Sequence, residues 1–475
     1  MAHTVATAEP LLALPQKADK PRWNTYAFSC ATLASMTTIL MGYNLALMSG
    51  AQLFIREDLG LSDAQIEVLA GSINVYMLVS ILAAGWAADV LGRRGTLVLA
   101  NAFLMAGALA MSLGGSYATL MAARFVTSIG SGFSVVVTSV YNAEISPASM
   151  RGLLSSFLDM FISIGLLLSY VSNYAFAGLP VYLGWRVMYA AGVLPPVFLA
   201  VGVLAMPESP RWLAMCERYA EAHAVLVRTS DTAAEADLRL KEIKQAVDAT
   251  QASDGGSVWK ELLIRPSASV RRILICVVGI HFFQQASGID AIVLYSPLVF
   301  KKAGMSSNSA ILSATVVVGV FKTCFVLVAT LFSDRLGRRP LLLASTAGVA
   351  VTMTSLGITL SVGTKSTASV AASISSVLAF MAAFSIGFGP LAGTYSAEIM
   401  PLRLRAQGAS LGNAVNRLTC GLVSMTFISL ADWITVPGCF FLYAGVAAAA
   451  CVFVYARLPE TKGRSLEDMD ELFAN

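Results

Sequence analysis

Charged residues are scarce in this 475-residue chain and make up only 13% of it. An average soluble domain carries about 25% charged residues, so the deficit argues against a soluble globular protein. The net charge at neutral pH is only +4, and the basic residues are spread over connecting segments. The charge pattern therefore gives no basis for nucleic-acid binding.

Paired cysteines and metal-ligand clusters are also missing. The seven cysteines stand singly, most of them inside apolar runs where Cys behaves as a small hydrophobe. The chain has no Walker A loop, which argues against ATP-driven transport. Because no nucleophile–base pair is evident either, we expect neither an enzyme nor a bound cofactor.

A secretory signal peptide is not expected, because residues 1–25 are polar and rich in Ala, Pro and Lys. This stretch is interpreted as a disordered cytoplasmic tail. Long apolar runs follow it: the chain is 56% hydrophobic with a mean hydropathy of +0.71. A helical membrane span needs about 20 mostly apolar residues. Twelve candidate spans meet this requirement, near 26–50, 68–90, 96–114, 118–141, 153–173, 185–206, 271–300, 310–333, 340–362, 370–399, 406–429 and 437–457.

The longest polar interval, 207–270, is expected to form short amphipathic helices on one membrane face. Ser209 and Pro210 are typical of a helix start, and Thr232 with Glu235 matches a capping box. Lys and Arg are concentrated here and in the loops that alternate with it, which predicts that this side is cytoplasmic. Both termini then lie in the cytoplasm.

Three motifs occur twice at nearly one separation. "DVLGRR" and "DRLGRR" begin at Asp89 and Asp334, 245 residues apart (334 − 89). "YNAEISP" and "YSAEIMP" place Glu144 and Glu398 254 apart (398 − 144), and "PESPR" and "PETKGR" begin 252 apart (459 − 207). This repetition predicts two six-helix bundles, 26–206 and 271–457, joined by 207–270 and followed by a cytoplasmic tail at 458–475.

A cluster of polar residues interrupts the apolar seventh span in "HFFQQASGIDAIVLYSP", residues 281–297. A polar side chain facing lipid is costly, so these residues should face the bundle interior or a wet cavity. An amide supplies both a donor and an acceptor, as a sugar hydroxyl does, so Gln284 and Gln285 suit a carbohydrate. The alternative is that they only bind neighbouring helices. Ser287 and Gly288 are expected to loosen the turn and bring Asp290 toward the amides.

These motifs together, with "RFVTSIGSG" and "PETKGRSLEDMDELF", resemble the sugar porter branch of the major facilitator superfamily. "HFFQQASGIDAIVLYSP" and "AEIMPLRLRAQG" are most similar to plant polyol and monosaccharide transporters. The resemblance spans about residues 26–473. It implies an all-α membrane protein in which two six-helix bundles surround a central cavity and move by alternating access.

The resemblance also implies which residues contact substrate. It adds Asp159, Lys322, Asn416, Tyr295 and the position of Gly393 to Gln284, Gln285 and Asp290. A buried Lys beside a carboxylate is less costly than either alone, so Lys322 is also a candidate for a structural ion pair.

Two positions depart from the family pattern. Proton-coupled members carry Asp in a "GYD" context in the first span, where this chain has Asn44 in "GYNLALMSG". An amide does not exchange protons near neutral pH, so either Asp159 takes the coupling role or the protein is a facilitator. Relatives commonly place Trp where this chain has Gly393, so the cavity should be larger here and ordinary hexose transport less certain.

Charged residues near the cytoplasmic ends of the spans form a predicted gate. Opposite charges at short spacing can latch the two bundles together in the outward-open state and release in the inward-open state. Anchoring by positive charge alone would explain the arginines but not their acidic companions. The predicted gate comprises Asp89, Arg93, Arg94, Arg124, Glu144, Arg151, Asp334, Arg338, Arg339, Glu398 and Arg405.

The sequence therefore predicts a secondary transporter for a polyol or monosaccharide, coupled to protons. A proton-independent uniporter and a non-transporting sugar sensor are the alternatives, although sensors of this fold usually carry longer cytoplasmic tails. The expected location is the plasma membrane or an internal membrane such as that of the vacuole.

Overall fold

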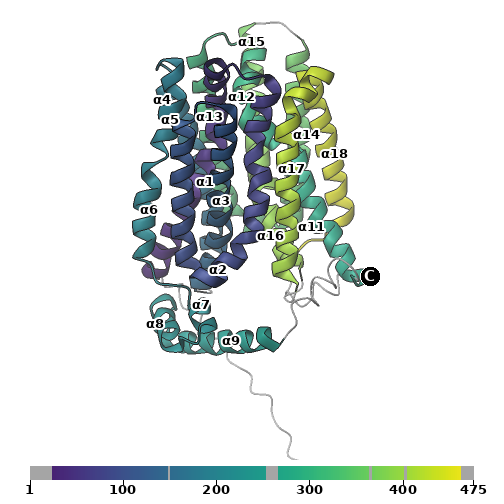
Figure 1. Ribbon diagram of the computed structural model, residues 1–475. Helices are drawn as coiled ribbons and strands as arrows, with labels where there is room; N and C mark the ends of the chain where they lie inside the picture. Colours follow the sequence, from purple (N-terminus) through teal and green to yellow (C-terminus); the bar gives the residue numbers. More distant parts are fainter. Residues whose placement is uncertain (1–23, 148–149, 253–265, 363–365, 401–403, 462–475) are drawn as a thin grey trace, which may run out of the picture.

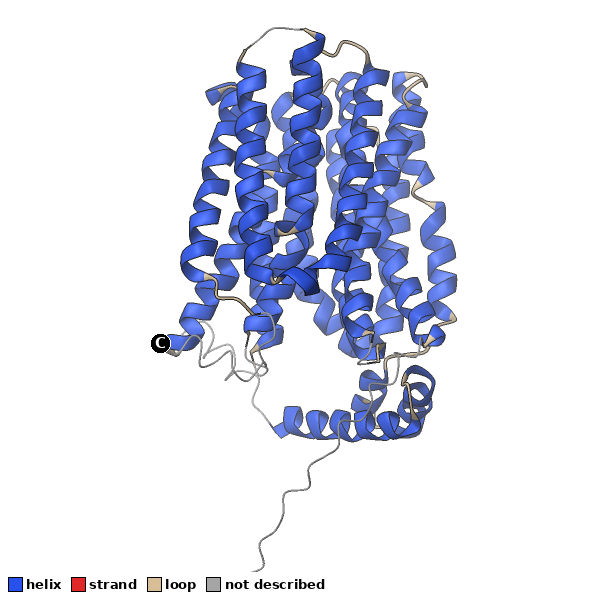
Figure 2. Cartoon of the chain, turned by 180° about the vertical axis from the view of Figure 1, so that it is seen from behind, coloured by secondary structure: helices blue, strands red, loops and turns tan. Residues whose placement is uncertain are grey.

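The computed structural model describes residues 24–147, 150–252, 266–362, 366–400 and 404–461. Throughout these ranges the regular secondary structure is α-helical (Figure 2). The helices are α1 (Thr25–Leu59), α2 (Asp63–Leu113), α3 (Tyr117–Ile145), α4 (Arg151–Phe176), α5 (Val181–Ala191), α6 (Leu194–Leu204), α7 (Pro210–Met215), α8 (Tyr219–Thr229), α9 (Ala233–Ala252), α11 (Ala268–Ala286), α12 (Ile289–Ala303), α13 (Asn308–Leu336), α14 (Arg338–Ser361), α15 (Thr367–Ile386), α16 (Phe388–Ile399), α17 (Arg405–Ile434) and α18 (Val436–Arg457). The predicted tails at 1–25 and 458–475 lie almost entirely outside the described residues.

Within the described residues, eleven helical stretches are long and apolar enough to cross a membrane. One of them, α2, has 51 residues and would be about 77 Å long if straight, whereas the hydrocarbon core is about 30 Å thick. Its backbone leaves helical geometry at Gly92 (φ 80°, ψ 166°), which divides it into two crossings. The twelve predicted spans and the all-α membrane fold are therefore confirmed.

The described part of the segment between the sixth and seventh crossings forms the helices α7, α8 and α9 at one end of the molecule (Figure 1). Ser209 caps α7 by accepting a hydrogen bond from the Trp212 amide, as predicted. The Glu235 amide donates to the Thr232 hydroxyl at 3.2 Å, but the Glu235 carboxylate accepts from the amide of Asp231. The predicted capping box is thus half formed at Thr232, and the Glu235 side chain bonds the backbone amide of the preceding residue, Asp231.

Helices α1–α6 pack mainly with one another, and helices α11–α18 do the same. Within the first group, α1 and α4 approach at backbone distance. A Cβ atom on Gly42 would lie 2.1 Å from the Ile162 carbonyl oxygen, and one on Gly165 would lie 2.0 Å from the Ile39 carbonyl oxygen. Small residues are what allow two helices to meet this closely inside a membrane.

The two groups are joined by hydrogen bonds toward the end opposite α7–α9. The Gln52 amide donates to the Leu294 carbonyl at 2.9 Å, and the Tyr170 hydroxyl donates to the Val293 carbonyl at 2.8 Å. The start of α1 marks the other end, because Asn24 donates to the Arg228 carbonyl of α8. The conformation is therefore one in which the groups are closed against each other on the side away from α7–α9.

Gly165→Ala is expected to lower the free energy of unfolding by about 1–3 kcal/mol, because the added methyl would overlap the Ile39 carbonyl. Gly445→Ala on α18 is the matched control, since a Cβ there meets no atom within 4 Å. Thermal unfolding of the two purified variants in detergent measures the difference. Equal melting temperatures for Gly165→Ala and the unsubstituted protein would contradict this packing.

Candidate functional site

The seventh crossing is broken in its middle. Helix α11 ends at Ala286, and α12 begins at Ile289 after Gly288, whose φ of 88° is strained for any residue with a side chain. A Cβ on Gly288 would also lie 2.7 Å from the ring of Tyr443. The predicted loosening at Ser287 and Gly288 is thus present, and it leaves a discontinuous helix of the kind that builds transporter sites.

Three amides meet just before this break. The Asn416 amide of α17 donates to Gln284 Oε1 at 2.7 Å, and the Gln285 amide donates to Asn416 Oδ1 at 3.1 Å. The Gln284 amide also donates to the carbonyls of Phe388 (3.0 Å) and Gly389 (2.7 Å) in α16. All three side chains are buried, and Gln285 Oε1 has no hydrogen-bond partner. The cluster is therefore held in place by the protein while one acceptor remains unused.

Helix α17 supplies partners for the rest of the broken span at four-residue spacing. The thiol of Cys420 donates to the carboxylate of Asp290, and the hydroxyl of Tyr295 donates to the Ser424 carbonyl at 2.7 Å. Asp290 and Tyr295 are buried. Both residues, which the resemblance places among the substrate contacts, are thus bonded to α17 in this conformation.

Two carboxylates and two cations lie within electrostatic range of one another across the groups. Asp159 on α4 interacts with Lys322 on α13 and with Arg417 on α17, and Asp290 interacts with the same two cations. Among these four described side chains no direct ion pair is formed. The predicted pairing of Lys322 is therefore a longer-range interaction here. Arg417 reaches the other group through a 3.4 Å hydrogen bond to Asn74.

Gly393 opens space beside the amides. It is exposed, and it lies one turn after Gly389, whose carbonyl holds Gln284. A Cβ added at Gly393 would meet no atom within 4 Å. The geometry agrees with the expectation that the missing aromatic side chain leaves room at this position.

Asn44 is buried on α1 and its side-chain amide donates to the Leu40 carbonyl of its own helix at 2.8 Å. The carbonyl of Asn44 accepts from Arg124 Nη1 at 3.1 Å. Arg124 is 1% exposed, and its Nε and Nη2 atoms have no hydrogen-bond partner. A buried guanidinium thus lies beside Asn44, the residue at which the resemblance to sugar porters leads one to expect a carboxylate.

The assignment of Arg124 to the cytoplasmic gate is wrong. Arg124 lies near the start of α3, whereas the other end of α3 contacts the α7 region through a bond from Tyr141 to the Pro207 carbonyl (3.0 Å). The predicted span 118–141 already places this arginine inside the span, near the end opposite the predicted gate.

A network of charges does lie at the end where α7–α9 are found. Arg93 bonds Glu144 at 3.0 Å and Asp89 at 3.1 Å. The carboxylate of Glu208 accepts the backbone amides of Arg93 (2.9 Å) and Arg94 (3.1 Å). These amides begin the third crossing, and a helix start favours an anion.

The second half of the chain repeats this network. Arg338 bonds Glu398 at 2.9 Å, and Glu460 accepts the backbone amides of Arg338 and Arg339, both at 3.0 Å. Two further contacts recur in both halves. The Ser209 hydroxyl donates to Glu144 at 2.5 Å, and the Thr461 hydroxyl donates to Glu398 at 2.6 Å. The Tyr141 hydroxyl donates to the Pro207 carbonyl at 3.0 Å, and the Tyr395 hydroxyl donates to the Pro459 carbonyl at 2.9 Å.

These contacts partly revise the predicted gate. Arg93 pairs with Asp89 and Glu144, and Arg338 pairs with Glu398, so these ion pairs lie within one group each. A latch between the two groups stays a prediction. Arg94 bonds the Met206 carbonyl rather than a carboxylate. The side chains of Arg151, Asp334 and Arg405 lie outside the described residues, and their pairs remain predictions. Glu208 and Glu460 were missed, although the repetition of "PESPR" and "PETKGR" was the signal that would have found them.

Comparison with known proteins agrees with this geometry. A model of the family described as sugar (and other) transporter matches residues 30–473. Polyol transporter 5 of Arabidopsis thaliana is 50% identical, with 99% of this chain and 91% of the relative aligned. The glucose transporter GlcP of Staphylococcus epidermidis is 32% identical, over 92% of this chain and 95% of that protein.

Among solved structures, the proton:xylose symporter XylE bound to 6-bromo-6-deoxy-D-glucose matches with a TM-score of 0.80 and 25% identity, covering 95% of this chain and 100% of that one. The chain therefore belongs to the sugar transporter family, within the sugar porter branch of the major facilitator superfamily, and is a multi-pass membrane transporter rather than an enzyme.

Proposed function

We propose that this protein moves a polyol or monosaccharide across a membrane by alternating access between two bodies, residues 26–206 and 271–457. The observation that carries the proposal is the amide cluster of Gln284, Gln285 and Asn416 beside a broken helix. A sugar hydroxyl both donates and accepts, so a fixed set of amides recognises it well.

Several features support a polyol as the substrate. Gln285 Oε1 is an acceptor without a partner, and such a group is costly until a ligand hydroxyl or water reaches it. Gly393 leaves room on the adjacent helix. A curated polyol transporter is half identical to this chain along nearly all its length.

The arrangement at Asn44 favours a facilitator as the second candidate. The Asn44 side chain bonds its own helix, and Arg124 has no carboxylate bonded to it. If transport is coupled to protons, Asp159 is the coupling candidate, because it is exposed on α4 within range of Lys322 and Arg417.

The membrane face that carries α7–α9 is proposed to be cytoplasmic, together with both termini, because the basic residues are concentrated there. The conformation described above is then closed toward the outside. The plasma membrane is the proposed location, with the vacuolar membrane as the alternative.

Asn416→Ala is expected to raise the KM for labelled sorbitol or mannitol roughly 5- to 50-fold in proteoliposomes, because it removes one ligand contact and releases both glutamines. Thr426→Ala is the control: it lies on the same helix, is exposed, and bonds only the Leu422 carbonyl of α17. An unchanged KM in Asn416→Ala, with transport intact, would contradict the proposed substrate site.

Asn44→Asp is expected to place a carboxylate beside Arg124 and to make polyol accumulation depend on an inward proton gradient. The measurement is uptake with and without that gradient, for the unsubstituted protein, Asn44→Asp and Asp159→Asn. A facilitator equilibrates polyol without accumulating it. If the unsubstituted protein accumulates polyol and Asp159→Asn abolishes this, Asp159 is the coupling residue and the facilitator assignment is wrong.

A further inference from the structure

Glu67 is a buried carboxylate that joins the two groups of helices. It belongs to α2 and is 1% exposed, yet its oxygens bond α17 rather than its own group. Glu67 Oε1 accepts the backbone amide of Ile428 at 2.6 Å and that of Ser429 at 3.2 Å. Its Oε2 accepts the Ser429 hydroxyl at 2.5 Å.

The position of these amides on α17 is unusual. They lie more than twenty residues into the helix, where a backbone amide normally bonds the carbonyl four residues earlier. For Ile428 that carbonyl belongs to Ser424, and the Ser424 carbonyl accepts the Tyr295 hydroxyl at 2.7 Å. Both ends of one backbone hydrogen bond therefore have side-chain partners from other helices, which is how a helix is opened or bent.

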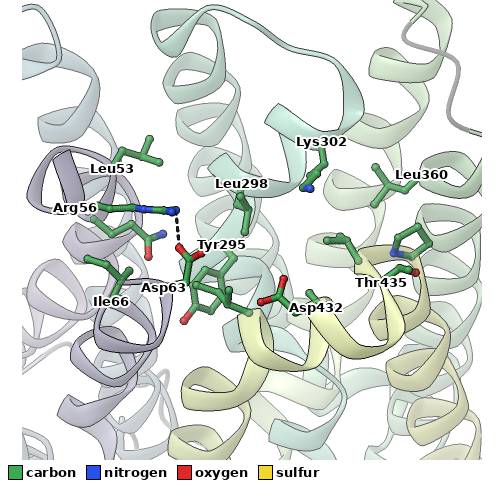
Figure 3. Close-up of a pocket in the computed structure, with 15 residues that line it drawn as sticks. Leu53, Arg56, Asp63, Ile66, Tyr295, Leu298, Lys302, Leu360, Asp432 and Thr435 are labelled. Carbon is green, nitrogen blue, oxygen red and sulfur yellow. Dashed lines mark ion pairs between the residues drawn. The ribbon is translucent and has the colours of Figure 1, made fainter. Parts of the chain in front are cut away.

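An outer pocket of about 530 Å³ lies beside this contact, between the two groups. Arg56 and Asp63 on one side form an ion pair at 2.6 Å, and Tyr295, Lys302 and Asp432 lie on the other (Figure 3). Ile66, the residue before Glu67, and Ile428, whose amide bonds the Glu67 carboxylate, both line the pocket. Glu67 thus lies at the seam that has to part if this pocket is to reach the amide cluster.

We propose that Glu67 is the outer gate of the transporter: its ionised carboxylate holds α17 against α2, and its neutralisation releases them. The sign follows from hydrogen-bond capacity. An ionised carboxylate only accepts, whereas a protonated one carries a donor that cannot face the amides of Ile428 and Ser429. The proposal rests on alternating access, and it deepens that function by naming the group that closes the outer side.

Other titratable groups surround this carboxylate and have to be separated from it. Tyr295 on α12 and Tyr443 on α18 interact with Glu67 electrostatically. The charged groups of the outer pocket are Arg56 on α1, Asp63 on α2, Lys302 on α12 and Asp432 on α17. The test therefore compares variants in which only Glu67 or its direct partner Ser429 is changed.

The test measures outer accessibility without substrate, so it remains readable even if the assigned solute is wrong. Leu298→Cys in the outer pocket is the reporter, labelled in right-side-out vesicles by a membrane-impermeant maleimide. Adding Glu67→Gln is expected to speed labelling about tenfold or more, since several bonds to a charged acceptor are weakened together. Glu67→Asp should restore slow labelling in part. Glu57→Gln, an exposed glutamate on α1 at the same end, should change nothing.

Ser429→Ala, which removes one donor, is expected to give a smaller increase and serves if Glu67→Gln does not fold. Equal labelling of the Glu67→Gln and native-Glu67 reporters would overturn the proposal.

Discussion

Inside a membrane protein, a polar side chain has only three kinds of partner: another protein group, water, or a ligand. This constraint organises the molecule. The amides of Gln284, Gln285 and Asn416 bond one another and the backbone of α16, which fixes their orientation before any ligand arrives. The acceptor without a partner, Gln285 Oε1, leaves the site able to accept a hydrogen bond from a ligand hydroxyl. Preorganised groups bind a ligand better because the cost of ordering them has already been met.

The duplicated halves use the same constraint to build their ends. Gly92 and Gly337 have φ of 80° and 91° with ψ of 166° and 155°, a conformation open almost only to glycine. Each glycine exposes the first amides of the next helix, and Glu208 or Glu460 accepts them. The carboxylate at each repeat thus ties the end of a crossing to the segment that follows the bundle. These two networks bond the helices of each half to one another at the end where α7–α9 lie, which suits bodies that move as units.

Much of this was predictable. Hydropathy identified all twelve crossings, because burying about 20 residues in lipid requires an unbroken apolar run. It did not identify the helix ends: α1 continues to Leu59 through Arg56, Glu57 and Asp58, which the apolar run excludes. The doubled motifs indicated two halves. The polar residues of the seventh span indicated the amide cluster, because a polar side chain that faces lipid is costly.

What could not be predicted depends on which helices meet and how each is rotated. Glu67 is a single carboxylate near the start of an apolar span, and its partner lies 361 residues away. The sequence did not show that Arg124 bonds the Asn44 carbonyl, and Tyr295, placed among the substrate contacts, bonds the α17 backbone. The two carboxylates that cap the repeats were visible only as parts of motifs. In each case the residue type was readable from the sequence and the partner was not.

The central claim is that the amide cluster binds the hydroxyl groups of the transported solute. A structure of the protein determined with a hexitol bound tests it most directly. The account predicts a hexitol hydroxyl within hydrogen-bond distance of Gln285 Oε1 and the carbon chain of the hexitol in the space beside Gly393. A ligand held elsewhere, with the three amides still bonded only to one another and to α16, would contradict it.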